Sequence, residues 1–330
     1  MCIRDSLCIL LASFFPAKGS FATGMHYASK VFLFLLFFFY GAKLAPRETL
    51  LGLKNWRLHA VIFCFTFILF PIIGVGLKYA TIGWLGQGLA LGLLYLTLVP
   101  GTVQSSIAFT SVAHGNVAGA IVASSLSNIL GVFLTPLLVM LTMATTGDVH
   151  ITGRSILDIF LQILLPFIIG QLLHKYLGPG LNRHPILTKT VDRGTIWINV
   201  YTAFSQAVVE GVWMRVTALH LLALVGICIA VVSLVLVLSW CMAKGLGFNR
   251  EDCIAAQFCG SKKSLSSGIA MGAVLFAGST GELSAGILML PLMLFHLFQL
   301  LICAVLAGRY GRQWEREHTH AHANDQGAAQ

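Results

Sequence analysis

The stretch FCGSKKSLSSGIAMGAVLF, residues 258–276, decides the fold class of this chain. It sets two adjacent lysines, Lys262 and Lys263, and four serines into a segment that is otherwise apolar. No acidic residue lies three or four positions from either lysine, so no ion pair along one helix can neutralise them. The composition of the surrounding chain therefore determines whether these charges lie in water or within a membrane.

The composition is that of a membrane protein. Of the 330 residues, 57% are hydrophobic and only 10% are charged, whereas a soluble domain carries about 25% charged residues. About 20 apolar residues suffice for a helix to cross a bilayer, and several charge-free runs are longer. These runs are Tyr79–Ala113, Gly115–Gly147, Val216–Ala243 and Leu283–Gly308. The sequence predicts an all-α polytopic membrane protein.

We expect about ten transmembrane helices. They are placed near residues 7–17, 28–43, 58–77, 85–113, 116–142, 156–174, 194–210, 217–243, 253–278 and 283–308. The first is too short to span a bilayer, because Pro16 follows closely. The opening residues MCIRDS are unlike a helix start and indicate a truncated or misassigned N-terminus.

The basic residues orient these helices. Ten spans place both termini on one side, and 14 of the 21 lysines and arginines fall on that side, whereas five fall on the other. Cytoplasmic loops carry such an excess, so both termini are expected in the cytoplasm, with the chain in the inner or plasma membrane. The net charge of +9 then belongs to loops that face anionic lipid headgroups, and it predicts no nucleic-acid partner.

The eight cysteines show neither disulfide nor metal spacing. They are expected to be small residues of the apolar core. The alternating His318, His320 and His322 could indicate metal binding, but they lie in a polar tail over residues 309–330 that is expected to be disordered. No metal site is therefore predicted.

Two predicted spans have polar interruptions. The fourth contains Pro100-Gly101 followed by QSSIA (104–108), and the ninth contains Gly260 followed by LSSGIA (265–270). They occupy equivalent places in two five-helix halves, and an odd number of helices per half makes the halves inverted. Interrupted helices at corresponding places of inverted repeats indicate the central binding site of a transporter. The alternative is that these small residues only allow close helix contact.

The two lysines are costly at this depth. Lys262 lies 11 residues beyond Glu251, or roughly 16 Å along a helix, which is near the middle of the bilayer. A lysine there costs roughly 2.5–3.5 kcal/mol on insertion scales. The side chains could extend toward an interface, but intramembrane charges usually face a functional cavity. We expect at least one of the two to line a transport site.

The segment PGTVQSSIAFTSVAHGNVAGAIVASSLSNILGVFLTPLL (100–138), together with FCGSKKSLSSGIAMG (258–272) and GLKNWRLH (52–59), resembles the bile acid:sodium symporter superfamily. The likeness is greatest to its SBF-like branch, which is related to solute carrier family 10 member 7. It implies ten helices in two inverted five-helix repeats, with two interrupted crossing helices and a panel domain that moves against a core domain. The expected organisation is one transporter domain, with repeats over about 7–142 and 156–308.

The resemblance also implies site residues. Ser105 and Ser106 match polar residues at an ion site of sodium-coupled members. Ser124 matches a hydroxyl of the next helix, with Asn128 one turn further on. Ser261 stands where those members have a sodium-binding glutamate, and Lys262 and Lys263 follow it. The remaining candidates for binding substrate or ion are Gln104, Ser264, Ser266 and Ser267.

Loss of the glutamate changes the expected chemistry. None of the 12 acidic residues lies near the middle of a predicted span, and a fixed ammonium group would repel sodium. Our hypothesis is that a lysine partly replaces the bound cation, so that the site holds an anionic substrate. No cofactor is expected other than sodium or a proton as the coupling ion.

The sequence thus predicts a symporter-like secondary active transporter for a small organic anion, in contact with membrane lipid. No G-x-x-x-x-G-K-[ST] motif for ATP is present. One alternative is a non-transporting membrane regulator of ion homeostasis. Another is an intramembrane enzyme, for which Ser264 beside Lys263 is the only nucleophile–base pair, and neighbouring side chains on a helix diverge. We therefore expect no enzyme activity.

Overall fold

The computed structural model describes residues 11–12, 14–43, 55–144, 160–183, 185–209, 211, 217–277, 279 and 281–328. Every regular element in these ranges is helical. The α-helices are α2 (Gly19–Lys43), α4 (Trp56–Cys64), α5 (Phe70–Leu85), α6 (Gln87–Leu98), α7 (Gln104–Val112), α8 (Val117–Val139), α10 (Leu165–Leu172), α11 (His174–Arg183), α12 (Pro185–Val209), α13 (Ala218–Gly245), α14 (Arg250–Gly260), α15 (Leu265–Leu275) and α16 (Ala285–Ala328). Short π-helical turns occupy Phe65–Leu69, Met140–Ala144 and Phe160–Leu164, and a 3-10 turn occupies Gly281–Leu283.

Five helices in the described part are long and apolar enough to cross a membrane. They are Gly19–Lys43, Trp56–Leu85, Val117–Met143, Ala218–Gly245 and Ala285–Glu317. A sixth candidate joins Phe160–Leu172 to His174–Leu181 through a bend of 92°. Many large apolar side chains on these helices are exposed, among them Ile72, Leu222 and Val305, as expected where lipid replaces water. The chain is an integral membrane protein.

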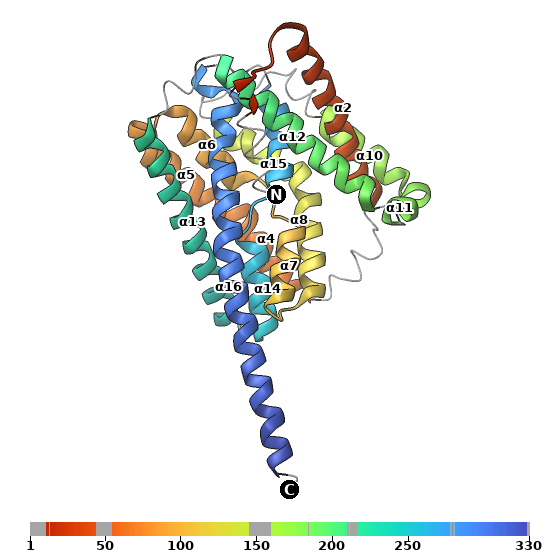
Figure 1. Ribbon diagram of the computed structural model, residues 1–330, viewed down its shortest axis with the longest axis vertical. Helices are drawn as coiled ribbons and strands as arrows, with labels where there is room; N and C mark the ends of the chain where they lie inside the picture. Colours follow the sequence, from red (N-terminus) through yellow and green to blue (C-terminus); the bar gives the residue numbers. More distant parts are fainter. Residues whose placement is uncertain are drawn as a thin grey trace.

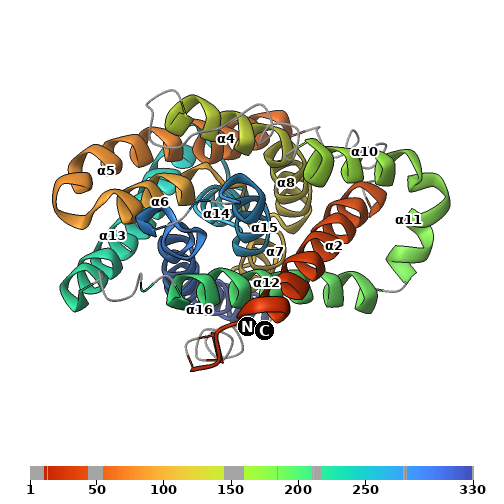
Figure 2. The same ribbon diagram turned by 90° about the horizontal axis from the view of Figure 1, so that it is seen from above.

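The helices form two groups. In the first, which we call the peripheral group, α2 packs against α10, α11 and α12. The second, the main group, contains α4 to α8 and α13 to α16, with α14 in contact with α4, α7, α8 and α13. Viewed from above, α14, α15 and α7 lie at the centre, with α2, α10 and α11 to one side and α5 and α13 to the other (Figure 2). Helix α12 joins the groups, because it contacts both α2 and the pair α15 and α16.

Two glycines bring α2 and α10 close together. A Cβ added at Gly170 would overlap the backbone oxygen of Phe38, and one added at Gly41 would overlap that of Phe167. Small residues allow such close approach of helices in membranes. The sequences FFFYGAK in α2 and PFIIGQL in α10 thus fix the geometry of the peripheral group.

Both predicted interruptions are present in the main group. Helix α6 ends at Leu98 and α7 begins at Gln104, and helix α14 ends at Gly260 and α15 begins at Leu265. The first break follows from Pro100, which disfavours a helical conformation in the preceding residue. Val99 accordingly has an extended conformation, with ψ of 155°. The two spans are therefore each divided into two short helices.

Other predicted boundaries differ from the structure. The seventh span was expected at 194–210, but α12 already begins at Pro185. The polar residues between 185 and 194 are therefore part of the helix and not of a loop. Their charged side chains, Lys189, Asp192 and Arg193, line the cavity described below. Residues 7–10 and 13 of the first predicted span lie outside the described residues, and the total of ten crossings stays a prediction.

The C-terminal segment also differs from expectation. The sequence predicts a disordered tail from Arg309, whereas α16 continues through Ala328 and extends beyond the rest of the bundle (Figure 1). Aromatic contacts hold its first turns: the rings of Tyr310 and Trp240 stack at 5.4 Å, and those of Trp314 and His114 at 4.0 Å. No proline interrupts the segment, so nothing in the backbone ends the helix there.

Candidate functional site

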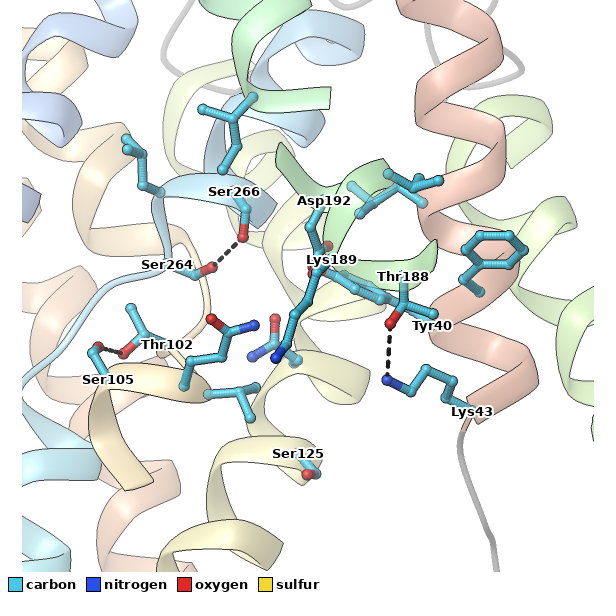
Figure 3. A pocket seen from close by; sticks show the side chains of 18 of the residues that line it. Tyr40, Lys43, Thr102, Ser105, Ser125, Thr188, Lys189, Asp192, Ser264 and Ser266 are labelled. Carbon is cyan, nitrogen blue, oxygen red and sulfur yellow. Dashed lines mark hydrogen bonds between the residues drawn. The ribbon is translucent and has the colours of Figure 1, made fainter. Parts of the chain in front are cut away.

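A cavity of about 640 Å³ lies between the peripheral group and the main group. Helices α2 and α12 supply one wall, and α7, α8, α15 and α16 supply most of the other (Figure 3). Binding sites for small molecules usually have volumes of about 300–1,000 Å³. The cavity is therefore large enough for a small organic molecule.

The peripheral wall carries the charge. The charged residues that line the cavity are Lys43 on α2 and Lys189, Asp192 and Arg193 on α12. Two hydrogen bonds organise this wall: the Tyr40 hydroxyl donates to Asp192 Oδ1 at 3.0 Å, and Lys43 Nζ donates to Thr188 Oγ1 at 3.3 Å. Three cationic groups thus surround one carboxylate, which leaves this wall with a net positive charge.

The main wall has no charged side chain among its described residues and combines polar groups with apolar side chains. Thr102 Oγ1 and Ser105 Oγ share a hydrogen bond of 2.6 Å in the first break, and Ser264 Oγ and Ser266 Oγ lie 3.4 Å apart in the second (Figure 3). Hydroxyl groups both donate and accept hydrogen bonds. This wall can therefore bind either kind of polar group on a ligand without adding charge.

Asn128 joins both breaks to the cavity. Its Nδ2 donates to Gly101 O at 2.8 Å, and its Oδ1 accepts from Ser267 Oγ at 2.8 Å. The Asn128 side chain also lines the cavity. One amide on α8 therefore contacts the first break, the second break and the candidate ligand site.

His296 on α16 presents a donor to the cavity wall. Gln299 Oε1 accepts from the backbone N–H of Lys263, so its Nε2 must be the atom that donates to Lys263 O and to His296 Nδ1. A neutral His296 then carries its hydrogen on Nε2. His296 lines the cavity, and no described residue pairs with Nε2. This N–H is a buried donor beside the cavity.

The two breaks are bonded to each other and to neighbouring helices. Ser264 N donates to Pro100 O at 2.8 Å, Thr135 Oγ1 donates to Leu98 O at 2.8 Å, and Gly101 N donates to Ser127 Oγ at 3.1 Å. Within a membrane, freed backbone groups must find partners inside the protein. These bonds, with those of Asn128 and Lys263, satisfy the carbonyls of residues 97–101.

The Lys263 ammonium lies inside this structure rather than at a surface. Its Nζ donates to Thr66 O at 2.9 Å, Thr97 O at 2.8 Å and Val99 O at 2.9 Å. The Phe70 ring centroid is 4.2 Å away, and the residue has no exposed surface. The side chain therefore does not extend to the membrane interface.

Lys262 has fewer polar partners. Its Nζ donates to Ser105 O at 2.8 Å and lies over the rings of Phe109 and Phe258, at 4.0 and 5.2 Å from their centroids. Lys262 also has no exposed surface. Neither lysine is among the residues that line the cavity, so a direct contact of either with substrate stays a prediction.

The other sequence-predicted residues divide into two sets. Gln104, Ser105, Asn128, Ser264 and Ser266 line the cavity. Ser106, Ser124, Ser261 and Ser267 lie behind it. Ser106 Oγ donates to Phe258 O at 3.1 Å, Ser124 Oγ to Cys259 Sγ at 3.6 Å, and Ser261 Oγ to Gln257 O at 2.6 Å. Ser106 and Ser124 connect helices around the breaks, whereas Ser261 bonds back to its own helix α14. The predicted roles of these serines in ion binding remain untested.

Sequence reasoning missed the peripheral wall. Its residues Lys43, Lys189 and Arg193 were counted as cytoplasmic loop charges, and Asp192 was placed outside a span. A signal was available: Lys189, Asp192 and Arg193 are spaced by three and four positions, which puts them on one face of a helix. His296 carried no signal, because a single histidine in an apolar run is usually a core residue.

The described residues do not arrange Ser264 and Lys263 as a nucleophile and base. Lys263 Nζ is directed to three carbonyl oxygens, while Ser264 Oγ contacts Ser266 and Ser267. Among the described residues, no group of three His, Cys, Asp or Glu side chains could hold a metal ion.

Comparison with known proteins places these features in a family. The model of the SBF-like CPA transporter family matches residues 3–312. An uncharacterized protein of Pseudomonas aeruginosa, PA2026, is 46% identical over 305 residues, which cover 92% of this chain and 90% of its own. The Escherichia coli protein named "Putative symporter YfeH" is 45% identical over 311 residues, covering 93% and 91%. "Sodium/bile acid cotransporter 7" of Xenopus tropicalis is 28% identical over 273 residues, covering 82% and 78%.

Proposed function

Because this chain belongs to the SBF-like CPA transporter family, we propose that it is a secondary active transporter that moves a small organic anion across the membrane. The observation that carries the proposal is the charge on the cavity walls. Three cationic side chains and one carboxylate line the peripheral wall, and uncharged polar groups line the main wall.

An anion would bind with its charge toward α12. Lys189 and Arg193 are exposed side chains at the cavity, so they can move to meet a ligand. Arginine can bind a carboxylate, sulfonate or phosphate oxygen pair with two hydrogen bonds, while lysine acts as a point charge. The hydroxyls of the two breaks would then bind polar groups on the remainder of the molecule.

We further propose ten membrane crossings in two inverted five-helix repeats, with both termini in the cytoplasm. Two observations support this arrangement. The broken pairs α6–α7 and α14–α15 occupy the fourth and ninth predicted spans, and their breaks contact each other through Ser264 and Pro100. The excess of lysine and arginine on one side supports the orientation.

The two helix groups are the proposed moving parts. Alternating access in such folds arises when one bundle rocks against another around a central site. The cavity lies between the peripheral and main groups, and helix α12 contacts both. A relative movement of the groups would expose the ligand first to one side of the membrane and then to the other.

The proposed coupling ion is a proton or sodium, and the cavity favours the proton. Asp192 is the only carboxylate among the residues that line it. Protonation of Asp192 would raise the net positive charge of the wall and strengthen binding of an anion by Coulomb attraction. A proton and an anion would then bind cooperatively, as symport requires.

Reconstitution in liposomes tests this function. Uptake of labelled monocarboxylates, sulfonates and organic phosphates should be measured with a sodium gradient, a proton gradient, both or neither. We expect at least one class to accumulate under one gradient, and we expect Arg193→Gln to reduce its uptake. Lys244→Gln, which removes an exposed charge from the end of α13, is the matched control. Absence of flux for every anion class under every gradient would contradict the proposal.

A further inference from the structure

Three backbone oxygens converge on one ammonium group in the core. Lys263 Nζ lies 2.8–2.9 Å from the carbonyl oxygens of Thr66, Thr97 and Val99. We call these three oxygens the carbonyl cage. The residue is fully buried, and the Phe70 ring lies 4.2 Å from Nζ. Among the described residues, the hydrogen-bond acceptors of this amine are all neutral backbone carbonyls.

Each cage oxygen has a local reason to lack a backbone partner. In the π-helical turn Phe65–Leu69, the N–H of Phe70 donates to Phe65 O. In the same register Thr66 O would accept from residue 71, which is proline and has no N–H. Thr97 and Val99 lie where α6 ends and the chain becomes extended, and the N–H of Gly101 donates to Ser127 instead of returning to Thr97.

The geometry suits the charged form of the amine, which has one N–H donor for each of the three carbonyls. A neutral amine has two N–H groups for the same three carbonyls. The positive charge is balanced by the negative end of the α6 dipole and by the face of the Phe70 ring. Carbonyl oxygens arranged in this way replace the hydration shell of a monovalent cation in selectivity filters.

We propose that the carbonyl cage is a monovalent-cation site and that the Lys263 ammonium is its covalently attached occupant. Removing the side chain would leave the three oxygens facing an unfilled space of the right polarity for a free cation. Distances of 2.8–2.9 Å suit ammonium or potassium better than the smaller sodium ion. The proposal of a cation site holds whether or not the protein is a transporter. Its consequence for coupling rests on the proposed function: no free sodium ion is needed at this position.

Two variants separate charge from volume. Lys263→Ala empties the cage, and Lys263→Met fills most of the same volume without charge. Lys262→Ala is the matched control, because Lys262 is equally buried and adjacent but contacts a single carbonyl and two rings. The thermal unfolding midpoint of each purified protein is measured in choline chloride and then with potassium, ammonium or sodium replacing choline at constant ionic strength.

We expect the midpoint of Lys263→Ala to rise and saturate with potassium or ammonium, by about 2–4 °C at ten times the dissociation constant. The midpoints of the wild type, Lys263→Met and Lys262→Ala should not respond. An equal response of all four proteins, or no response of Lys263→Ala to any cation, would overturn the cation site.

A folding defect of Lys263→Ala would not prevent the test. The variant is then expressed and purified in potassium, ammonium or ethylammonium salts, and the folded yield is compared with that in choline. Recovery in those salts alone supports the cage as a cation site. No recovery in any salt, with normal recovery of Lys262→Ala, overturns it. If the cage binds cations but wild-type flux depends on sodium, the site stands and only its consequence for coupling fails.

Discussion

Lys263 and Gln299 are joined through two hydrogen bonds between the second helix break and α16. The backbone N–H of Lys263 donates to Gln299 Oε1 at 2.9 Å, and Gln299 Nε2 donates to Lys263 O at 2.8 Å. The same Nε2 contacts His296 Nδ1 at 2.7 Å. Gln299 thus connects the residue that fills the carbonyl cage to a histidine at the cavity wall.

Gln299→Glu should destabilise the protein. A carboxylate can still accept from the Lys263 N–H, but it cannot donate to Lys263 O or to His296 Nδ1, and residue 299 has no exposed surface. Leaving such groups unpaired costs about 1–3 kcal/mol each. The measurement is the unfolding free energy in detergent. The control is Gln313→Glu, at an exposed position on α16, which should change the unfolding free energy by under about 0.5 kcal/mol. Equal effects of the two substitutions on the unfolding free energy would refute this role for Gln299.

Arg193→Gln should weaken binding of the transported anion by roughly tenfold. Arg193 is one of three cationic residues that line the cavity. It is the arginine among them, and a guanidinium group can form two parallel hydrogen bonds to an oxyanion. Arg193→Lys should restore only part of the loss. Isothermal titration or competition for uptake measures the change. Lys244→Gln serves again as the control, and unchanged affinity in Arg193→Gln would show that the anion binds elsewhere.

Asp192→Asn should strengthen anion binding and reduce its dependence on pH. In the wild type, a charged Asp192 opposes the anion, so affinity should rise as the pH falls and this carboxylate gains a proton. The amide is neutral at every pH, so the variant should bind tightly throughout. The control is Glu251→Gln, which changes an exposed acid in the first turn of α14 and should keep the wild-type pH dependence of anion affinity. Weaker anion binding by Asp192→Asn than by the wild type at all pH values would contradict the prediction.

Gly170→Ala should disrupt the peripheral group, because its Cβ would overlap the Phe38 backbone oxygen and α2 would have to move away from α10. Backbone cannot shift as readily as the end of a flexible side chain, so we expect a loss of about 1–3 kcal/mol in unfolding free energy. Gly24→Ala, in the partner helix α2 but with no atom within 4 Å of the added Cβ, is the control and should be neutral or stabilising. A neutral Gly170→Ala would show that the α2–α10 contact can adjust.

Several features could be predicted from the sequence because they depend on neighbouring residues. Long apolar runs such as Val216–Ala243 predict membrane helices whatever packs against them, and α13 is one. Pro100 and the polar runs after it predict interrupted helices, and the chain is interrupted there. The charge of Lys262 and Lys263 in an apolar segment predicts that at least one of them lines the transport site; both are fully buried and neither lines the cavity, so that role stays a prediction.

The cavity could not be predicted in this way. Lys43 and Arg193 are distant in sequence and come together only because α2 packs along α12. Charges near the end of a span look the same in sequence whether they face a loop or a cavity. The length of α12 depends on its contacts with α2 and α15, and those contacts turn apparent loop residues into a charged wall.

The amino-acid sequence alone thus determined the medium, the helical class and the positions of the two breaks, because hydropathy and backbone chemistry act over a few residues. Only the tertiary structure decided what each buried charge touches. Lys263 is held by carbonyls nearly 200 and more than 160 positions away, and such partners meet only when helices from both halves of the chain pack together. The sequence shows that an ammonium group must be accommodated, and the fold supplies the oxygens that accommodate it.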